Sequence, residues 1–288
     1  MKAFPIPVSF VGPGTQIEDE TLQYMNMPQG MDTFRPPVLP EPEALIGHRQ
    51  AHLALRDVLA QLDATRADGR NRSVDLAQLP PADLMLINQV MGEGEVSAQV
   101  RGAGDAVRQV DVQESVFAGV WRVVVRDNGR VVSDTIELGA IPQLLTTAAR
   151  QDVWFTVPRW TGALPPNVQN APALLSEIED QWRAWQPGAP AHVVNLTLLP
   201  MSNEDIGFMD HHLGTGSVLI LSRGYGNCRI TSTRVPNTWR VVYYNSQDAV
   251  ILNTVEVTAL PEVAQAAQED LDDSYERLRE VLEWVEAA

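Results

Sequence analysis

The sequence predicts an α+β fold made of two copies of a helix–antiparallel sheet–helix unit, preceded by an irregular N-terminal arm. The first observation is an internal repeat, in which "LGTGSV" (213–218) matches "MGEGEV" (91–96) and "WRVVYY" (239–244) matches "WRVVVR" (121–126). The second is that short strand patterns gather between helical ones, whereas a doubly wound parallel sheet would alternate them. A chain of 288 residues with 44% hydrophobic and 20% charged residues has the composition of a globular protein.

The repeat keeps its order along the chain, which makes chance a poor explanation. The glycine-containing motif recurs after 122 residues and the tryptophan motif after 118, so the copies differ by four residues between these motifs. A third match places "NTVEVTALPEVAQAA" (253–267) over "DTIELGAIPQLLTTA" (134–148). Each copy is therefore expected to contain a helix, Gly-x-Gly, a strand, an Arg-Gly-x-Gly turn, further strands around the tryptophan, and then a proline followed by a helix.

Four segments follow from composition and periodicity. Residues 1–42 are rich in Pro, Met and Gly without a sustained period, which predicts the irregular arm. Residues 43–152 are predicted as a helix plus the first α+β repeat, 153–190 as a linker with one helix, and 191–288 as the second α+β repeat with its C-terminal helix.

Three helices show apolar stripes at helical spacing. The stripe of the first helix ends before the polar loop "RADGRNRS", and that of the second ends at "QPGAPAH". The last helix has the clearest stripe, between charged faces. The three stripes are Leu55, Val58, Leu59 and Leu62; Leu174, Ile178, Trp182 and Trp185; and Leu271, Tyr275, Leu278, Leu282 and Val285.

Charge and hydropathy exclude several classes of protein. A net charge of −16 without a basic cluster argues against a nucleic-acid partner. No apolar run reaches the ~18 residues of a membrane helix, and the proline-broken N-terminus lacks the core of a secretory signal, so we expect a soluble, cytoplasmic protein without membrane insertion. The acidic segment 262–288 is interpreted either as a solvated helix face or as a surface that attracts a basic partner.

The two glycine motifs predict turns. Gly214-Thr-Gly216 follows a helix and leads into a strand, the opposite order from a phosphate-binding loop, and is typical of a helix C-cap. The Arg-Gly-x-Gly motif predicts structural turns that need positive φ at Gly102, Gly104, Gly224 and Gly226.

The candidate binding residues lie at the turn of the second copy, where Tyr225, Asn227 and Arg229 are specific to that copy and Arg223 matches Arg101 of the first. Arg223, Tyr225, Asn227 and Arg229 surround the second turn, and Tyr and Arg are common interface anchors. We predict that these four residues form a partner-binding surface. The alternative is a purely structural role in the turn.

Catalytic, metal and cofactor motifs are missing from the sequence. Cys228, the single cysteine, lacks a local cysteine-protease signature, and we predict a buried thiol in preference to a nucleophile. His211 and His212 are adjacent and diverge on a helix, while His48 and His52 supply only half of a zinc site. We therefore predict no catalytic residue, no metal and no cofactor.

Long strings of the chain resemble the HupH/HyaF family of hydrogenase expression/formation proteins. They are "ILSRGYGNCRITSTRVPNTWRVVYYNSQDAVILNTVEV" with "ALPEVAQAAQEDLDDSYERL", and the earlier blocks "LPEPEAL", "GEGEVSAQV" and "QESVFAGVWRV". The resemblance implies a non-enzymatic accessory protein for maturation of an uptake nickel–iron hydrogenase. It further implies a chaperone that binds the small-subunit precursor, with its basic leader, before export by the twin-arginine route.

Two alternatives stay open at this point. One is a thiol-dependent redox or cluster-assembly factor that uses Cys228. The other is a scaffold that joins other hydrogenase maturation proteins.

Overall fold

The computed structural model describes residues 47–102, 108–224 and 226–287, with side chains through Trp284. The predicted arm (1–42), Gly104 and Tyr225 lie outside the described residues. The helices are α2 (Arg49–Asp68), α3 (Pro81–Met91), α4 (Gln143–Gln151), α5 (Ala171–Ala184), α6 (Asn203–Leu213) and α7 (Gln268–Ala287), with 3-10 helices η1 (Leu196–Leu198) and η2 (Glu262–Ala264). The strands are β1 (Arg72–Asp75), β2 (Val96–Arg101), β3 (Arg108–Glu114), β4 (Val120–Asp127), β5 (Arg130–Leu138), β6 (His192–Asn195), β7 (Val218–Ser222), β8 (Asn227–Ser232), β9 (Thr238–Tyr244) and β10 (Val250–Val257).

All ten strands form one antiparallel sheet, in the order β1-β5-β4-β3-β2-β7-β8-β9-β10-β6. The predicted α+β class with antiparallel pairing is therefore confirmed. From its outer edge to the centre of the sheet, the first half (α2 to α4) has the strand order β1-β5-β4-β3-β2. The second half (α5 to η2) has the equivalent order β6-β10-β9-β8-β7. No helix in the described ranges has the length and apolar character needed to cross a membrane.

The two halves meet at β2 and β7, which pair across the middle of the sheet. Val96 lies opposite Ser222, Ala98 opposite Ile220, and Val100 opposite Val218. Since Val96 and Val218 occupy matching positions in the two motifs, the register is symmetric about the Ala98–Ile220 pair. The prediction left the packing of the two halves open; the structure joins them edge to edge in one sheet.

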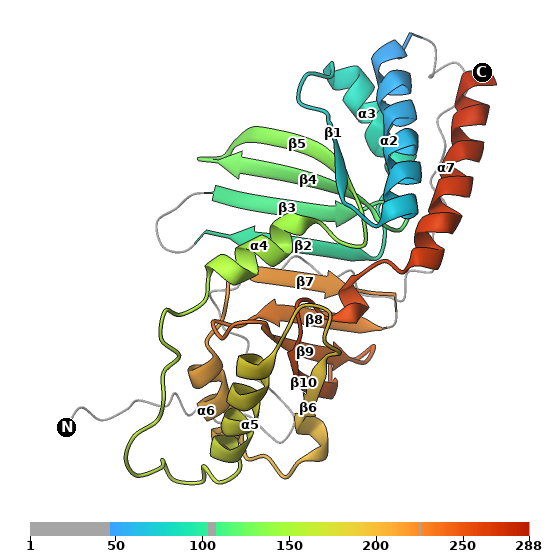
Figure 1. The fold of residues 1–288 in the computed structure, drawn as a ribbon. Helices are drawn as coiled ribbons and strands as arrows, with labels where there is room; N and C mark the ends of the chain where they lie inside the picture. The colour runs from blue at the N-terminus through green and yellow to red at the C-terminus, as the bar shows by residue number, and fades with distance from the viewer. Residues whose placement is uncertain (1–46, 103–107, 225, 288) are drawn as a thin grey trace.

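The helices cover the sheet in three groups (Figure 1). Helices α2, α3 and α7 lie together at the β1 end, α5 and α6 lie at the β6 end, and α4 crosses the middle with η2 beside it. Three hydrophobic cores result. The first lies under α2, α3 and α7, the second under α4 and η2, and the third under α5 and α6.

The predicted stripe of α2 is its buried face. Leu55, Val58 and Leu62 are fully buried, and Leu59 packs beside them. Gly69 ends the helix in the left-handed conformation with φ +69°, where its N–H donates to the Thr65 carbonyl.

Matching aspartates hold the first turns of α2 and α5. Asp83 Oδ1 accepts the Ala51 N–H at 2.9 Å. Asp205, 122 residues later, accepts the N–H groups of Gln169, Asn170 and Ala171 at 2.8, 2.9 and 3.0 Å. Each aspartate belongs to the helix that follows, α3 or α6, and so ties two helices of its own half together.

Several elements differ from their predicted form. The edge strands β1 and β6 were not predicted. In the second half, Pro261 is followed by the 3-10 helix η2, and not directly by an α-helix. Within the segment predicted as a linker, α5 packs on β6 and β10, and Trp185 lies just beyond its last residue.

Candidate partner-binding surface

The predicted partner-binding residues lie in the β7–β8 hairpin and along β8. Arg223 and Gly224 are exposed, and Asn227 and Arg229 are half-buried on β8. The hairpin is attached to the first half, because the Arg223 N–H donates to the Glu95 carbonyl at 3.1 Å. Sequence reasoning missed Glu95, which lies 128 positions earlier in the chain.

Positive φ explains only one of the two glycines here. Gly226 has φ +98°, as predicted. Gly224 has no positive φ; a Cβ at this position would collide with the Glu95 carboxylate. The prediction of positive φ at Gly224 was therefore wrong; this glycine packs instead against the end of the flexible Glu95 side chain.

The corresponding hairpin of the first half is four residues longer. Ser222 pairs with Cys228 across the β7–β8 turn, whereas its counterpart Val100 pairs with Val110 in the β2–β3 hairpin. Gly102 is also outside the positive-φ region, which corrects the prediction for it, and its N–H donates to Arg108. The length difference inferred from the repeat thus lies in this hairpin.

Asn227 and Arg229 project from β8 on the face opposite to Cys228. Asn227 lies opposite Tyr244 on β9, and Arg229 hydrogen-bonds the Tyr244 hydroxyl. Burial raises the pKa of Tyr244, and the Arg229 guanidinium opposes this shift. Tyr244 therefore remains a neutral phenol that positions the guanidinium.

Cys228 lies inside the central core, with a side chain that is 3% exposed. The Tyr243 hydroxyl donates a hydrogen bond to its sulfur, yet burial dominates and raises the pKa of the thiol to about 12. The predicted burial is found. Because the thiolate is the reactive form, a thiol with this pKa is a poor nucleophile at neutral pH.

The Gly-x-Gly motifs are helix caps and points of close backbone approach. Gly92 and Gly214 follow α3 and α6 with φ +57° and +64°. A Cβ at Gly94 would collide with the Ser115 carbonyl, and one at Gly216 with the Ser232 hydroxyl. These contacts account for both glycines of each motif without a phosphate ligand.

The histidines take part in helix packing. His48 Nδ1 lies 3.7 Å from Asp83 Oδ1, and His212 Nδ1 is 2.8 Å from the Phe208 carbonyl oxygen. His211 and His212 have ring centroids 5.2 Å apart. Within the described part of the chain, no group of three or more His, Cys, Asp or Glu side chains is arranged to hold a metal ion.

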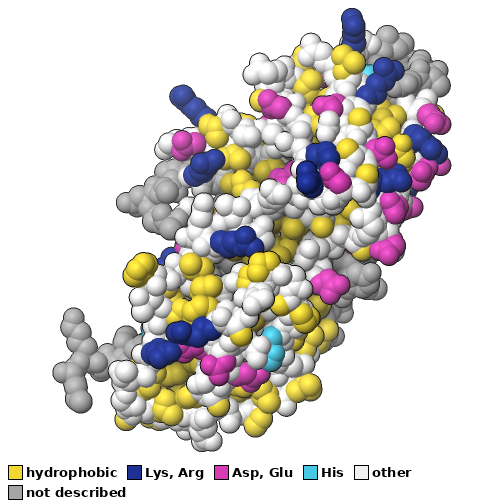
Figure 2. All heavy atoms as spheres, in the orientation of Figure 1, with side chains coloured by type: hydrophobic (Ala, Val, Ile, Leu, Met, Phe, Trp, Pro, Cys, Tyr) yellow, Lys and Arg dark blue, Asp and Glu magenta, His cyan; other side chains and the backbone are white. Residues whose placement is uncertain are grey.

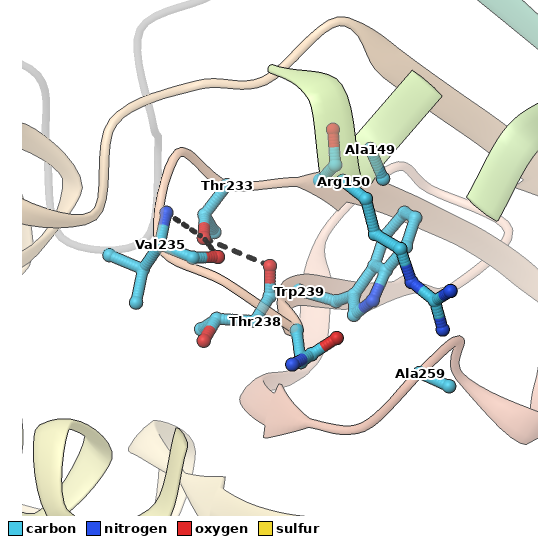
Figure 3. Close-up of a pocket in the computed structure, with 9 residues that line it drawn as sticks. Ala149, Arg150, Thr233, Val235, Thr238, Trp239 and Ala259 are labelled. Atoms are coloured by element: carbon cyan, nitrogen blue, oxygen red, sulfur yellow. Dashed lines mark hydrogen bonds between the residues drawn. The ribbon is translucent and has the colours of Figure 1, made fainter. Parts of the chain in front are cut away.

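A small pocket lies between the end of α4 and the β8–β9 turn. In Figure 3, Arg150 extends from α4 alongside the Trp239 ring, and Thr233 is hydrogen-bonded to Val235 and Thr238. Its volume is about 10 Å³, which is room for about one water molecule. This pocket is too small for a substrate.

Acidic side chains are concentrated on α7. The helix contains eight Asp or Glu residues and two arginines. Figure 2 shows acidic side chains following the edge of the molecule where α7 lies. An acidic face of this kind speeds the association of positively charged molecules, and salt screens this effect.

A family model and several relatives match most of the chain. The family model "HupH hydrogenase expression protein, C-terminal conserved region" matches residues 49–161 and 168–285. The chain is 55% identical to the hydrogenase expression/formation protein HoxQ of Cupriavidus necator, over 99% of both chains. It is 49% identical to the hydrogenase expression/formation protein HupH of Rhodobacter capsulatus, over 96% of both chains.

A solved structure of the hydrogenase expression protein HupH from Thiobacillus denitrificans is 26% identical. The match covers 38% of this chain and 92% of that one, with a TM-score of 0.36. The sequence relatives define the class, that of hydrogenase expression/formation proteins. The chain belongs to the HupH hydrogenase expression protein family, and the resemblance found in the sequence is confirmed.

Proposed function

We propose that this protein is a non-enzymatic chaperone for maturation of an uptake nickel–iron hydrogenase. It binds the small-subunit precursor in the cytoplasm, before the precursor is exported by the twin-arginine route. The observation that carries the proposal is similarity over nearly the whole chain to proteins named for hydrogenase expression and formation.

The charge of the molecule supports a basic partner segment. The net charge is −16, and the acidic face of α7 extends along one edge. A precursor with a basic leader would associate faster with such a surface, and the association would weaken as salt is added.

We place the contact with the folded part of the precursor at the β7–β8 hairpin. Arg223 is exposed there, and Arg229 is held by Tyr244. Tyr225 belongs to the same proposed surface by its position in the sequence.

An affinity-tag pull-down tests the function. Full-length protein is captured from cells that express the hydrogenase genes, with the small subunit present either with or without its leader. Capture of the precursor supports the chaperone. Loss of capture without the leader identifies the leader as the main contact, and failure to capture either form contradicts the proposal.

The binding surface is tested by replacing Tyr225 and Arg229 together with alanine. We expect a loss of precursor capture by about tenfold, the effect of removing interface anchors. Arg108→Ala, an exposed arginine on β3 of the longer first-half hairpin, is the matched control and should bind normally. Undiminished capture by a folded double variant would move the contact elsewhere.

The alternatives make different predictions. A Cys228-dependent redox factor requires reactive thiol chemistry, against which the burial and the high pKa of Cys228 argue; full maturation in Cys228→Ser would eliminate it. A scaffold would co-purify with other maturation proteins even in cells that lack the small subunit.

We also infer that the two halves arose by duplication. The same family model matches 49–161 and 168–285, and both halves have the same strand order. The matching aspartates, Asp83 and Asp205, support the same inference.

A further inference from the structure

The apolar stripe of α2 has a counterpart on α5 that is much less covered. Leu55, Val58 and Leu62 of α2 are completely buried. The residues 120 positions later, on α5, are Leu175, Ile178 and Trp182. Of these only Ile178 is buried, at 1% exposure, while Leu175 and Trp182 are half-buried.

The difference comes from what lies over each helix. Leu271, Leu278 and Leu282 of α7 complete the core above α2. Above α5, the chain that follows α4 is not helical between residues 152 and 170, and it contributes Trp154, Val157 and Trp160. Among the described residues, three side chains from an irregular segment thus pack in the core of α5, whereas a 20-residue helix packs on α2.

A groove remains over α5 as a result. It has a volume of about 540 Å³, within the range of ~300–1,000 Å³ found for ligand sites. One face of α5, from Pro172 to Arg183, forms one wall, and Trp160 and Phe208 contribute aromatic surface, with their ring centroids 5.5 Å apart. The groove therefore presents apolar surface along about three turns of helix.

Arginine side chains lie at the edge of the α2 surface that binds α7 and at the edge of the α5 groove. In the first half, Arg66 of α2 forms an ion pair with Asp272 of α7 at 3.0 Å and stacks over Tyr275. At the α5 groove, the side chains of Arg159 and Arg183 are 66% and 54% exposed, and both contact Glu179 Oε1. A guanidinium has five N–H donors, so a second carboxylate can be bound beside Glu179.

We propose that this groove docks an amphipathic helix of a partner protein, with apolar residues at i, i+3 or i+4, and i+7 and with carboxylates beside the stripe. Such a helix would bury Leu175 and Trp182 as α7 buries Leu55 and Leu62, and its carboxylates would meet Arg159 and Arg183. The site is separate from the proposed precursor contact, because Val235 of the groove and the β7–β8 hairpin lie beyond opposite ends of β8. It therefore goes beyond the proposed function.

The test uses a labelled synthetic peptide of residues 268–287, which has this pattern, titrated with the full-length protein. We expect saturable binding that weakens with added salt. Ser176→Trp, from an exposed position in the groove wall, should fill the groove and weaken binding by about tenfold. Ala173→Trp, exposed on the same helix but outside the groove lining, should leave binding unchanged.

Three results would overturn the proposal. They are the absence of saturable binding, equal binding by the Ser176→Trp protein, and equal binding by a peptide in which Leu278→Asp breaks the apolar stripe. Equal binding by Ser176→Trp would indicate that the peptide competes with α7 for α2. Precursor capture by Ser176→Trp is measured alongside, so that failure of the groove and failure of the chaperone function are distinguished.

Discussion

Glu114 and Ser232 occupy the same position in the two halves, at the end of β3 and of β8. The Ser232 hydroxyl accepts the Val218 N–H at 3.1 Å, and the Glu114 carboxyl accepts the N–H of Val96, the counterpart of Val218, and that of Gly119. Both side chains are buried. One backbone requirement is thus met by a neutral group in one half and by a titratable group in the other, so matching folds need not respond equally to pH.

The largest effect on the free energy of unfolding is expected when the aspartates that bind the starts of α2 and α5 are replaced, and the two aspartates should differ. Asp205 accepts three N–H groups from the start of α5 and that of Ser202, and these bonds lower its pKa despite burial; Asp83 accepts only the Ala51 N–H from α2. We expect Asp205→Ala to lower the free energy of unfolding by about 3–4 kcal/mol, and Asp83→Ala by about 1–2 kcal/mol. Urea unfolding measures both.

The conservative variant Asp205→Asn keeps an acceptor oxygen and should recover part of the loss. If Asp83→Ala costs as much as Asp205→Ala, the number of accepted bonds does not set the stability of these helix starts.

The second largest effect on stability is expected at Glu114, the counterpart of Ser232. Burial raises the pKa of Glu114 from 4.5 to about 7, and the charges of Glu95 and Asp270 add to the shift. The folded state therefore binds this proton more tightly than the unfolded state. The resulting stabilisation is complete below pH 4.5 and is lost as the pH rises through about 7.

Glu114→Gln, which keeps an acceptor without the charge, should raise the free energy of unfolding at pH 8 by about 3 kcal/mol and change it little at pH 4.5. Thermal and urea unfolding between pH 4.5 and 8 measure the difference. Parallel pH profiles for the two proteins would show that Glu114 titrates normally.

The smallest effect is expected at Ser232. Ser232→Ala removes the acceptor for the buried Val218 N–H and should cost about 1–2 kcal/mol. Since no proton is gained or lost, the cost should be the same at pH 5 and pH 8. A cost that varies with pH would mean that another group titrates with the β7–β8 pair.

The sequence was sufficient where a pattern is local. The stripe of Leu55, Val58 and Leu62 indicated the buried face of α2, and the cap glycines Gly92 and Gly214 marked the ends of α3 and α6. The strands β1 and β6 were missed because each has only four residues, too few to show alternation.

The parts that could not be predicted depend on distant segments. Gly224 resembles a positive-φ turn glycine, but it lacks positive φ and packs against the carboxylate of Glu95, which precedes β2 in the first half. Trp182 fits a buried stripe, yet it is half-buried, and within the described residues no helix packs over α5 as α7 packs over α2. A local sequence pattern cannot predict these contacts, because they depend on which distant segment packs against each turn or helix.

The pairing of β2 with β7 has a consequence for the chain as a whole. Separated from the other half, each half would end in a strand whose N–H and C=O groups have no neighbour, and such edges promote association between molecules. Within one chain, each open edge finds its partner at a high effective concentration that does not depend on how much protein is present. The β2–β7 pairing therefore forms as readily in a dilute cell extract as in a concentrated solution.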